Sequence, residues 1–384
     1  MYIWEQSGWP NFTFDYNALA PRLKTIRALR KALLGQSNEL PKGVDMEAQM
    51  DALIQNAIRT SEIEGEKLNV ESVRSSVARQ LGMQSAGIRG GTEQTNALVG
   101  MLLAATQDLD TPLSQAMLCQ WQARLFPEGP GLIHPVNIGE LRGEAPMRVL
   151  SGSIEKPVVH FEAPLRDKLE PELKAFLDWF NQPPKDLDEL IRAGIAHLWL
   201  VTLHPFDDGN GRVTRAVTDR ALAQAEQQSI RFYSLSAAIM DRRKEYYTQL
   251  ENAQKGDLDI TPWLSWFLSV LELALKQGQA RFVRVLNKSR FWYHHSQTLL
   301  TERQIKVLNR LLDVGAAQKD AEGFEHGINA EKYKSLTKVS KATATRDLTD
   351  LLSKGCLIKL PGGGRSTRYA INYGDNLQSP APEA

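Results

Sequence analysis

The stretch LHPFDDGNGRVTR, residues 203–215, brings together side chains that suit phosphate chemistry. A neutral imidazole at His204 can take the proton from an attacking hydroxyl group. Gly209 and Gly211 carry no side chains, so their backbone N–H groups can face a ligand. A helix is predicted from Gly211 onward, and a helix N-terminus attracts negative charge. The loop therefore combines a general base with a cradle for an anion.

Two arginines and a carboxylate extend this pattern. Arg212 and Arg215 are three positions apart, which places them on one face of the predicted helix. Two guanidinium groups on one face suit a polyphosphate better than a single carboxylate. Asp208 offers a hard oxygen ligand for Mg²⁺, and Asn210 can fix the loop or donate to a phosphate oxygen. Together with His204 they predict phosphoryl or nucleotidyl transfer, which depends mostly on positioning and charge neutralisation.

Each of these residues also has an ordinary structural role when it is taken singly. A Gly-Asn-Gly sequence commonly forms a turn, Asp207 and Asp208 can cap a helix, and His204 can pack at a helix end. The joint occurrence of all of them favours chemistry. The competing chemistry is a metal-dependent phosphohydrolase with His197, His204 and Asp208 as ligands, but that hypothesis gives the two arginines no role.

The segment HPFDDGNGR followed by Arg215 resembles the signature of Fic-domain proteins, HxFx(D/E)GNGRxxR, and matches every fixed position. The resemblance implies transfer of AMP from ATP to a Ser, Thr or Tyr hydroxyl of a protein, with release of pyrophosphate. It implies that His204 is the general base, that Phe206 anchors the loop in the core and that Asp208 holds Mg²⁺. It places ATP on the second half of the motif: Gly209, Asn210, Gly211, Arg212, Val213, Thr214 and Arg215. The Doc branch, which phosphorylates, has a lysine where Gly211 stands, so this chain does not resemble Doc.

Two further segments fit the same family. Residues 147–150 and 158–161 are β-prone runs separated by SGSIEKP, which predicts a hairpin. The hairpin lies where Fic proteins have a flap that clamps the target by strand addition; taken alone, it could equally be a structural edge. The segment RRKEYYTQLENAQ resembles the adenine-side segment of the family, although core packing also explains a tyrosine pair. Its candidate ATP-binding residues are Tyr246, Tyr247 and Asn252.

The segment RTSEIEGE, residues 59–66, can be interpreted as an acidic helix end with Gly65 as its stop. It also fits the inhibitory motif of Fic proteins, (S/T)xxxE(G/N), with Thr60, Glu64 and Gly65. By this resemblance Glu64 pairs with Arg215 and blocks the γ-phosphate site, so that ATP binds unproductively. The electrostatics support this role, because a carboxylate competes with a phosphate for the same guanidinium.

The predicted fold class is mostly α, because apolar residues recur at helical spacing along most of the chain. We expect an N-terminal helical region at 1–110 with the inhibitory helix, a Fic catalytic domain at 111–280 with the hairpin flap, and a winged helix-turn-helix domain at 300–375. The helix after residue 110 is predicted to begin at Pro112, a residue that is favoured at the first helical position.

The C-terminal segment SKATATRDLTDLLSKGCLIKLPGGGRSTRYAIN resembles a winged helix-turn-helix, with residues 343–352 as the recognition helix and PGGGRSTR as the wing. Its basic residues suit the phosphates of DNA: Lys338, Lys341, Arg346, Lys354, Arg365 and Arg368. Many such domains instead bind proteins or dimerise. A transcription regulator is therefore an alternative function, beside a phosphohydrolase or a de-adenylylating enzyme.

The composition narrows the remaining possibilities. The 46 basic and 45 acidic residues nearly cancel, so global charge does not favour nucleic acid. Cys119 and Cys356 form no CxxC pattern, which predicts a reducing cytoplasm. No signal peptide and no run of roughly 18 apolar residues is found, so no membrane is expected. The predicted cofactor is Mg²⁺, and the predicted partners are ATP, an unidentified target protein, the chain itself as acceptor and, by resemblance, a second copy in a homodimer.

Overall fold

The computed structural model describes most of the chain: residues 1–38, 44–83, 90–129, 136–153, 156–228, 232–313, 327–361 and 367–374. The fold is mostly α-helical, as the sequence predicts; the described residues contain fourteen α-helices and two small sheets. The chain forms two compact units. The first consists of Met1–Glu39 and Gln49–Lys276, and the second of Leu40–Ala48 and Gln277–Ala384. No helix in the described ranges is long and apolar enough to cross a membrane.

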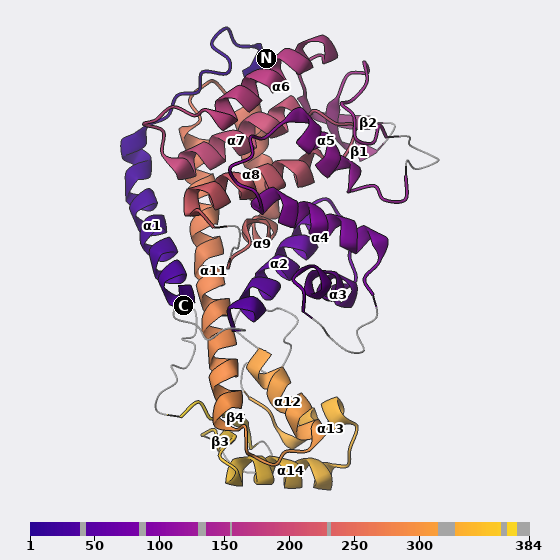
Figure 1. Cartoon of the computed structure of the whole chain (residues 1–384), viewed down its shortest axis with the longest axis vertical. Helices are drawn as coiled ribbons and strands as arrows, with labels where there is room; N and C mark the ends of the chain where they lie inside the picture. The colour runs from indigo at the N-terminus through magenta and orange to yellow at the C-terminus, as the bar shows by residue number, and fades with distance from the viewer. Residues whose placement is uncertain are drawn as a thin grey trace. The chain divides into compact units, whose positions relative to one another are not determined.

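The first unit is built almost entirely from helices (Figure 1). A short 3-10 turn, Ile3–Glu5, opens the chain. The helices that follow are α1 (Tyr16–Asn38), α2 (Val44–Ile63), α3 (Val70–Gln80), α4 (Glu93–Thr106), α5 (Gln115–Ala123), α6 (Arg166–Asn181), α7 (Glu189–Leu203), α8 (Asn210–Glu226), α9 (Leu235–Asp241), α10 (Arg243–Lys255) and the first part of α11 (Thr261–His294). The predicted start of α5 at Pro112 is wrong. Ser114 caps that helix instead, because its side chain accepts a hydrogen bond from the Met117 N–H.

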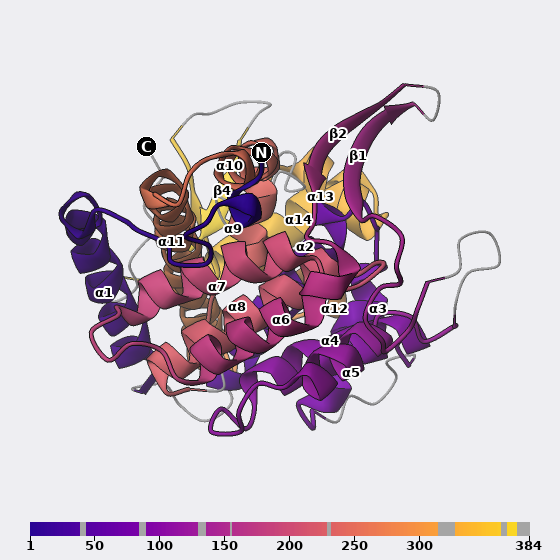
Figure 2. The same ribbon diagram turned by 90° about the horizontal axis from the view of Figure 1, so that it is seen from above.

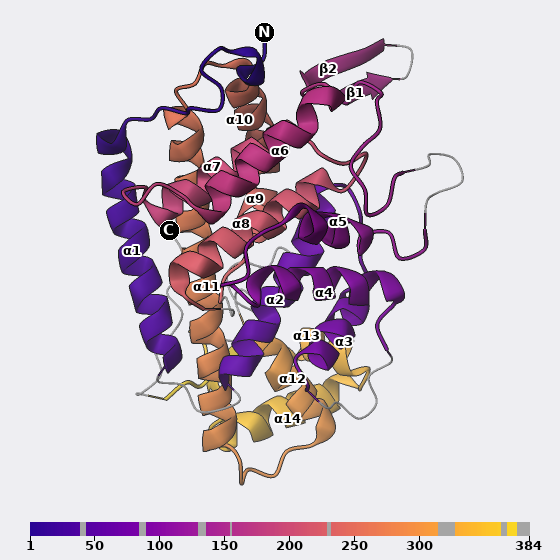
Figure 3. The same cartoon turned by 45° about the horizontal axis from the view of Figure 1, so that its top comes forward.

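Helix α7 lies at the centre of this unit, with α6 and α8 beside it (Figures 2 and 3). Its sequence, ELIRAGIAHLWLVTL, is apolar on nearly all sides, which is typical of a helix that is covered all round. Gly194 allows α11 to approach closely, because a Cβ at this position would lie only 2.8 Å from Cδ2 of Leu264. Asp188 caps α7 by accepting hydrogen bonds from the first amides of the helix. The buried α7 thus fixes the point at which the motif loop begins.

The predicted hairpin is confirmed. Strands β1 (Arg148–Ser153) and β2 (Lys156–Glu162) pair antiparallel, with a register shift between Val149 and Leu150. They extend away from the helices (Figure 2). Both strands run further than the sequence predicts, because the ladder continues through Gly152, whose φ of 90° is accessible to glycine. The predicted turn therefore shrinks, and residues 154–155 lie outside the described ranges.

The second unit has its own apolar core around Phe291, Leu308 and Leu348. Its elements, besides the end of α11, are α12 (Glu302–Asp313), α13 (Ala330–Thr337), α14 (Lys341–Ser353) and the antiparallel strands β3 (Leu357–Lys359) and β4 (Tyr369–Ile371). The predicted recognition helix falls within α14, which Ser340 caps. Among the candidate basic residues, three are exposed, Lys338, Lys341 and Arg346; two are half-buried, Lys354 and Arg368; and Arg365 lies outside the described residues.

Candidate functional site

The motif loop joins α7 to α8. His204 follows the last residue of α7 in a left-handed conformation, with φ 49° and ψ 59°, and Gly209 precedes α8 with φ 89°. The side chain of Phe206 is fully buried. Asn210 closes the loop, because its Oδ1 accepts from Phe206 N at 2.9 Å and its Nδ2 donates to Phe206 O at 2.7 Å. The side chain of Asn210 therefore holds the loop, which was one of its two expected roles.

His204 presents one ring nitrogen as a base. The imidazole is half-buried, and its Nδ1 lies 3.2 Å from the carbonyl oxygen of Val201. Because a carbonyl can only accept, Nδ1 carries the proton and Nε2 keeps its lone pair. Burial lowers the pKa of His204 and outweighs the hydrogen bond to Val201, which raises it. The imidazole is therefore neutral at pH 7, as a general base requires.

The first turns of α8 hold two buried arginines, each with one N–H group that lacks an acceptor. Arg212 and Arg215 are only 4% and 1% exposed. Arg212 Nε and Arg215 Nη1 are buried and have no hydrogen-bond partner. A Cβ on Gly211 would lie 3.1 Å from Arg215 Nη1, so glycine keeps the space in front of this guanidinium free. Buried donors are normally satisfied, and an anion placed at the first turn of α8 would satisfy these.

The C-terminal end of α2 reaches these arginines. Arg215 donates from Nη2 to Glu64 Oε1 at 2.8 Å, from Nε to Thr60 Oγ1 at 2.8 Å and from Nη2 to Thr60 O at 2.9 Å. Burial raises the pKa of Glu64, but the charge and hydrogen bond of Arg215 outweigh it and hold that pKa below its usual range. A Cβ on Gly211 would lie 2.1 Å from Glu64 Oε1. The carboxylate therefore enters the space that Gly211 leaves open.

Gly65 and Glu66 follow directly. Gly65 ends α2 with φ 89°, a conformation that favours glycine. Arg212 Nη1 donates to both oxygens of Glu66, at 2.8 and 2.9 Å. The sequence interpretation missed Glu66, although it is the last residue of RTSEIEGE and only two positions after Glu64. Each arginine of the cradle thus holds one carboxylate from the same short segment.

Asp208 is the candidate metal ligand. Its side chain is 57% exposed, and its Oδ1 lies 3.7 Å from Arg212 Nη2. That Oδ1 accepts from Gly209 N at 2.5 Å. No group of three or more His, Cys, Asp or Glu side chains in the described ranges is arranged to hold a metal ion. Mg²⁺ needs no such group, because it commonly binds through one or two carboxylates together with substrate phosphates and water. An exposed carboxylate beside a phosphate cradle fits this mode.

His197 does not join Asp208 and His204, so the phosphohydrolase ligand set is not brought together. Its side chain is fully buried. Nδ1 lies 2.9 Å from Thr218 Oγ1, and Nε2 lies 3.0 Å from Tyr246 Oη. Burial, with the charge of Arg215, lowers the pKa of His197 to about 3. Both ring nitrogens are thus engaged by hydroxyl groups in the core.

The residues of the motif loop lie in a region that matches a known domain family. The family model described as "Fic/DOC family" matches residues 112–222, which include the whole motif loop. The chain carries a Fic domain. A second model, described only as a domain of unknown function (DUF4172), matches residues 2–83 and so includes Thr60 and Glu64.

Among curated proteins, the chain is similar to a protein adenylyltransferase Fic of Nematostella vectensis, 26% identical over 259 residues, which are 64% of this chain and 56% of that protein. It is also similar to the protein adenylyltransferase fic-1 of Caenorhabditis elegans, 35% identical over 88 residues, 23% of this chain and 16% of that protein. The chain therefore spans about half or less of these relatives. A solved Fic family protein from Desulfovibrio desulfuricans G20 shares the fold, with a TM-score of 0.53, 18% identity and coverage of 94% of this chain and 98% of that chain.

The remaining candidate ATP-binding residues lie on α8 and α10 in different settings. Val213 and Thr214 are each 1% exposed on α8, and Thr214 Oγ1 is buried without a hydrogen-bond partner. Tyr246 is buried against Trp266 with its ring centroid 5.7 Å away, Tyr247 donates to Ile63 O at 3.0 Å, and Asn252 is exposed on α10. Tyr247 therefore contacts the end of α2.

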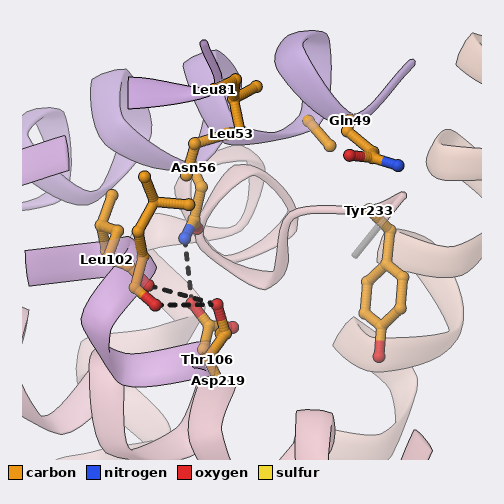
Figure 4. Close-up of a pocket in the computed structure, with 10 residues that line it drawn as sticks. Gln49, Leu53, Asn56, Leu81, Leu102, Thr106, Asp219 and Tyr233 are labelled. Carbon is orange, nitrogen blue, oxygen red and sulfur yellow. Dashed lines mark hydrogen bonds between the residues drawn. The ribbon is translucent and has the colours of Figure 1, made fainter. Parts of the chain in front are cut away.

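Side chains at the C-terminal end of α2 and just after it form hydrogen bonds with α8. Asn56, Thr60 and Glu64 recur at intervals of four, which places them on one face of α2. Asn56 Nδ2 donates to Asp219 Oδ2 at 2.9 Å, and Asp219 lies one turn after Arg215 on α8. A cavity of about 60 Å³ borders this contact, between α2, α4 and α8; Figure 4 shows the Asn56 amide pointing toward Asp219. Glu64 is thus the last of three side chains, after Asn56 and Thr60, that form hydrogen bonds with α8.

Proposed function

We propose that the chain is a protein adenylyltransferase, which transfers AMP from ATP to a Ser, Thr or Tyr hydroxyl of a protein, itself included. The observation that supports this most is the pair of buried arginines on α8, each with an unpartnered N–H group, on the helix that follows the loop of the base His204. A polyphosphate supplies the acceptors that these donors lack. The names of the similar curated proteins support the same reaction class.

In the proposed reaction, the acceptor hydroxyl oxygen forms a bond to the α-phosphorus of ATP. The bond between that phosphorus and the bridging oxygen breaks, and pyrophosphate leaves with the electron pair. The hydroxyl proton passes to Nε2 of His204, the ring nitrogen that keeps a lone pair. Arg212 and Arg215 stabilise the negative charge of the polyphosphate. Asp208 would hold Mg²⁺, which supplies further neutralisation of phosphate charge when it is bound.

We further propose that Glu64 keeps this activity low. The carboxylate engages Arg215 Nη2 at 2.8 Å and fills the space in front of Gly211. The γ-phosphate needs the same guanidinium, so the two anions compete. Because the pKa of Glu64 is held below its usual range, the carboxylate is charged throughout the neutral pH range. Thr60 contributes by fixing Arg215 from two sides.

The flap is the proposed binding site for the acceptor segment. Leu150, Val158 and Val159 are 52%, 54% and 39% exposed. These side chains project from strands β1 and β2, which pair with no third strand among the described residues. Strand addition combines backbone hydrogen bonds with apolar side-chain contacts, so the flap fits an extended segment of the target protein.

We also propose that the second unit binds duplex DNA and that two copies of the chain form a homodimer. Lys338, Lys341 and Arg346 are exposed at and near the N-terminus of α14. Lys341 is partly neutralised by Glu331, whose carboxylate lies 2.8 Å from its Nζ. The second function class suggested by the sequence, transcription regulation, depends on this surface.

The adenylyl transfer itself is tested with ATP labelled at the α- or the γ-phosphate. Incubation of the full chain with Mg-ATP is expected to fix the α-label on protein and to release the γ-label as pyrophosphate. Fixation of the γ-label would show phosphoryl transfer instead. Incubation of a protein that already carries AMP tests the alternative activity, de-adenylylation, which would release AMP.

A further inference from the structure

The buried Arg142 connects three segments around the base. Its side chain is 1% exposed. Nε donates to the carbonyl oxygen of His204 at 2.9 Å, and Nη2 donates to that of Pro164. The backbone N–H of Arg142 donates to the carbonyl oxygen of Pro205, also at 2.9 Å. One residue thus holds the carbonyls of both His204 and Pro205.

These contacts join the base to the two ends of the flap. Arg142 lies on the segment that leads into β1, which begins at Arg148. Pro164 lies just beyond the end of β2, before α6. Arg166 closes this arrangement, because its Nε donates to the carbonyl oxygen of Arg142 at 2.8 Å. The segments before and after the flap therefore meet at a single guanidinium, which also contacts the backbone of His204.

The energetics suggest a positional role. Backbone carbonyls accept from the guanidinium of Arg142, and in the described part of the chain no carboxylate forms an ion pair with it, although the charges of Asp207 and Glu144 raise its pKa from further away. Burial outweighs these charges and lowers that pKa, so the buried charge is costly. The backbone of His204 is also strained, because a left-handed conformation is unfavourable for a non-glycine residue and persists only where surrounding contacts impose it. Arg142 supplies such contacts.

We propose that Arg142 is a positioning residue that sets the imidazole of His204 relative to the flap, so that the base meets the hydroxyl that the flap presents. The inference rests on the proposed adenylyl transfer. It separates two functions of the site: Arg212 and Arg215 bind the nucleotide, and Arg142 aligns base and acceptor. Loss of Arg142 then lowers the rate of transfer while nucleotide affinity is retained.

The experiment uses the Glu64→Gly chain as the parent and compares Arg142→Lys and Arg142→Gln. Lysine keeps the charge but lacks the planar fork, and glutamine keeps one donor group. Both are expected to lower kcat for self-adenylylation about tenfold to a hundredfold, as expected for a misplaced catalytic group. The Kd for ATP is expected to change by less than about twofold, because the buried donors of α8 are untouched.

Arg220 provides a matched control. It is also fully buried, and it donates to backbone carbonyls, including that of Asp108, another non-glycine residue with positive φ, 45°. It does not contact His204. Arg220→Lys is expected to lower the melting temperature but to leave kcat of the folded protein within about twofold. A purely structural role for Arg142 predicts instead that Arg142→Lys behaves like Arg220→Lys, with a lower melting temperature and a kcat of the folded protein within about twofold of the parent.

A second readout does not depend on activity. Long-range ¹H–¹⁵N correlations of the His204 ring report whether Nδ1 still carries the proton that it donates to Val201. We expect a single tautomer in the parent and a mixture in Arg142→Lys. An unchanged tautomer with unchanged kcat would overturn the proposal, as would equal losses of kcat and ATP affinity. If the Glu64→Gly parent transfers no AMP at all, the proposed function fails, and the tautomer alone decides the role of Arg142.

Discussion

Glu64→Gly should raise adenylyl transfer, because it removes the anion that competes with the γ-phosphate. The interaction lost is one charge-assisted hydrogen bond, from Arg215 Nη2 to Glu64 Oε1 at 2.8 Å. Such bonds contribute about 1.5–3 kcal/mol, which corresponds to roughly a tenfold to hundredfold change in occupancy. The side chain of Glu64 is 31% exposed, so solvent weakens the pair and favours the lower end of this range.

The assay follows self-modification with α-labelled ATP at saturating Mg-ATP. Glu64→Gln separates charge from bulk, because the amide still fills the space before Gly211 but no longer pairs as an anion. We expect Glu64→Gly to be the most active variant, Glu64→Gln intermediate, and the combination of Glu64→Gly with Arg215→Ala low again. Glu62→Gln is the matched control, because Glu62 pairs with Arg59 on α2. If Glu64→Gly were no more active than the unaltered chain, the inhibitory role of Glu64 would be refuted.

Three further outcomes are expected. His204→Ala in the Glu64→Gly chain should abolish transfer while ATP binding, measured by calorimetry, survives. Because burial lowers the pKa of His204, the rate of the Glu64→Gly parent should stay flat as pH falls from 8 through 6.5. A loss of rate centred at pH 6.5 would contradict a lowered pKa. Glu66→Gln should tighten ATP binding by up to about fivefold, less than at Glu64 because Glu66 is 38% exposed; unchanged affinity would show that Arg212 is already free for phosphate. Binding of duplex DNA by the full chain should fall steeply with salt and weaken in Arg346→Ala, and absence of binding at low salt would favour a protein partner.

Much of the site could be predicted because its central residues are contiguous. His204, Asp208, Arg212 and Arg215 occupy one loop and the helix after it, so their types and spacing already imply that they act together. Glu64 could be connected to Arg215 only through the resemblance of its motif, because the two residues come from separate helices. The mostly helical fold followed from apolar spacing alone.

Other features depend on contacts between segments that are far apart in the sequence. Arg142 lies in a connection without a repeating pattern, and its contacts with His204 and Pro164 arise only when the two ends of the flap meet. For Tyr246, the residue type alone does not determine its role. A tyrosine pair predicts either a ligand contact or core packing, and its burial against His197 depends on the position of α10 relative to α7. At α5, the prediction relied on Pro112, and the helix begins instead after Ser114, whose side chain caps it.

Intact-mass spectrometry of the Glu64→Gly chain, after incubation with Mg-ATP, tests adenylyl transfer most directly. We predict a mass increase of one or more adenylyl groups, with pyrophosphate as the other product, and no increase when His204→Ala is combined with Glu64→Gly. An unmodified chain that binds ATP and is offered accessible hydroxyls, or a mass increase of a phosphoryl group, would contradict the proposed reaction.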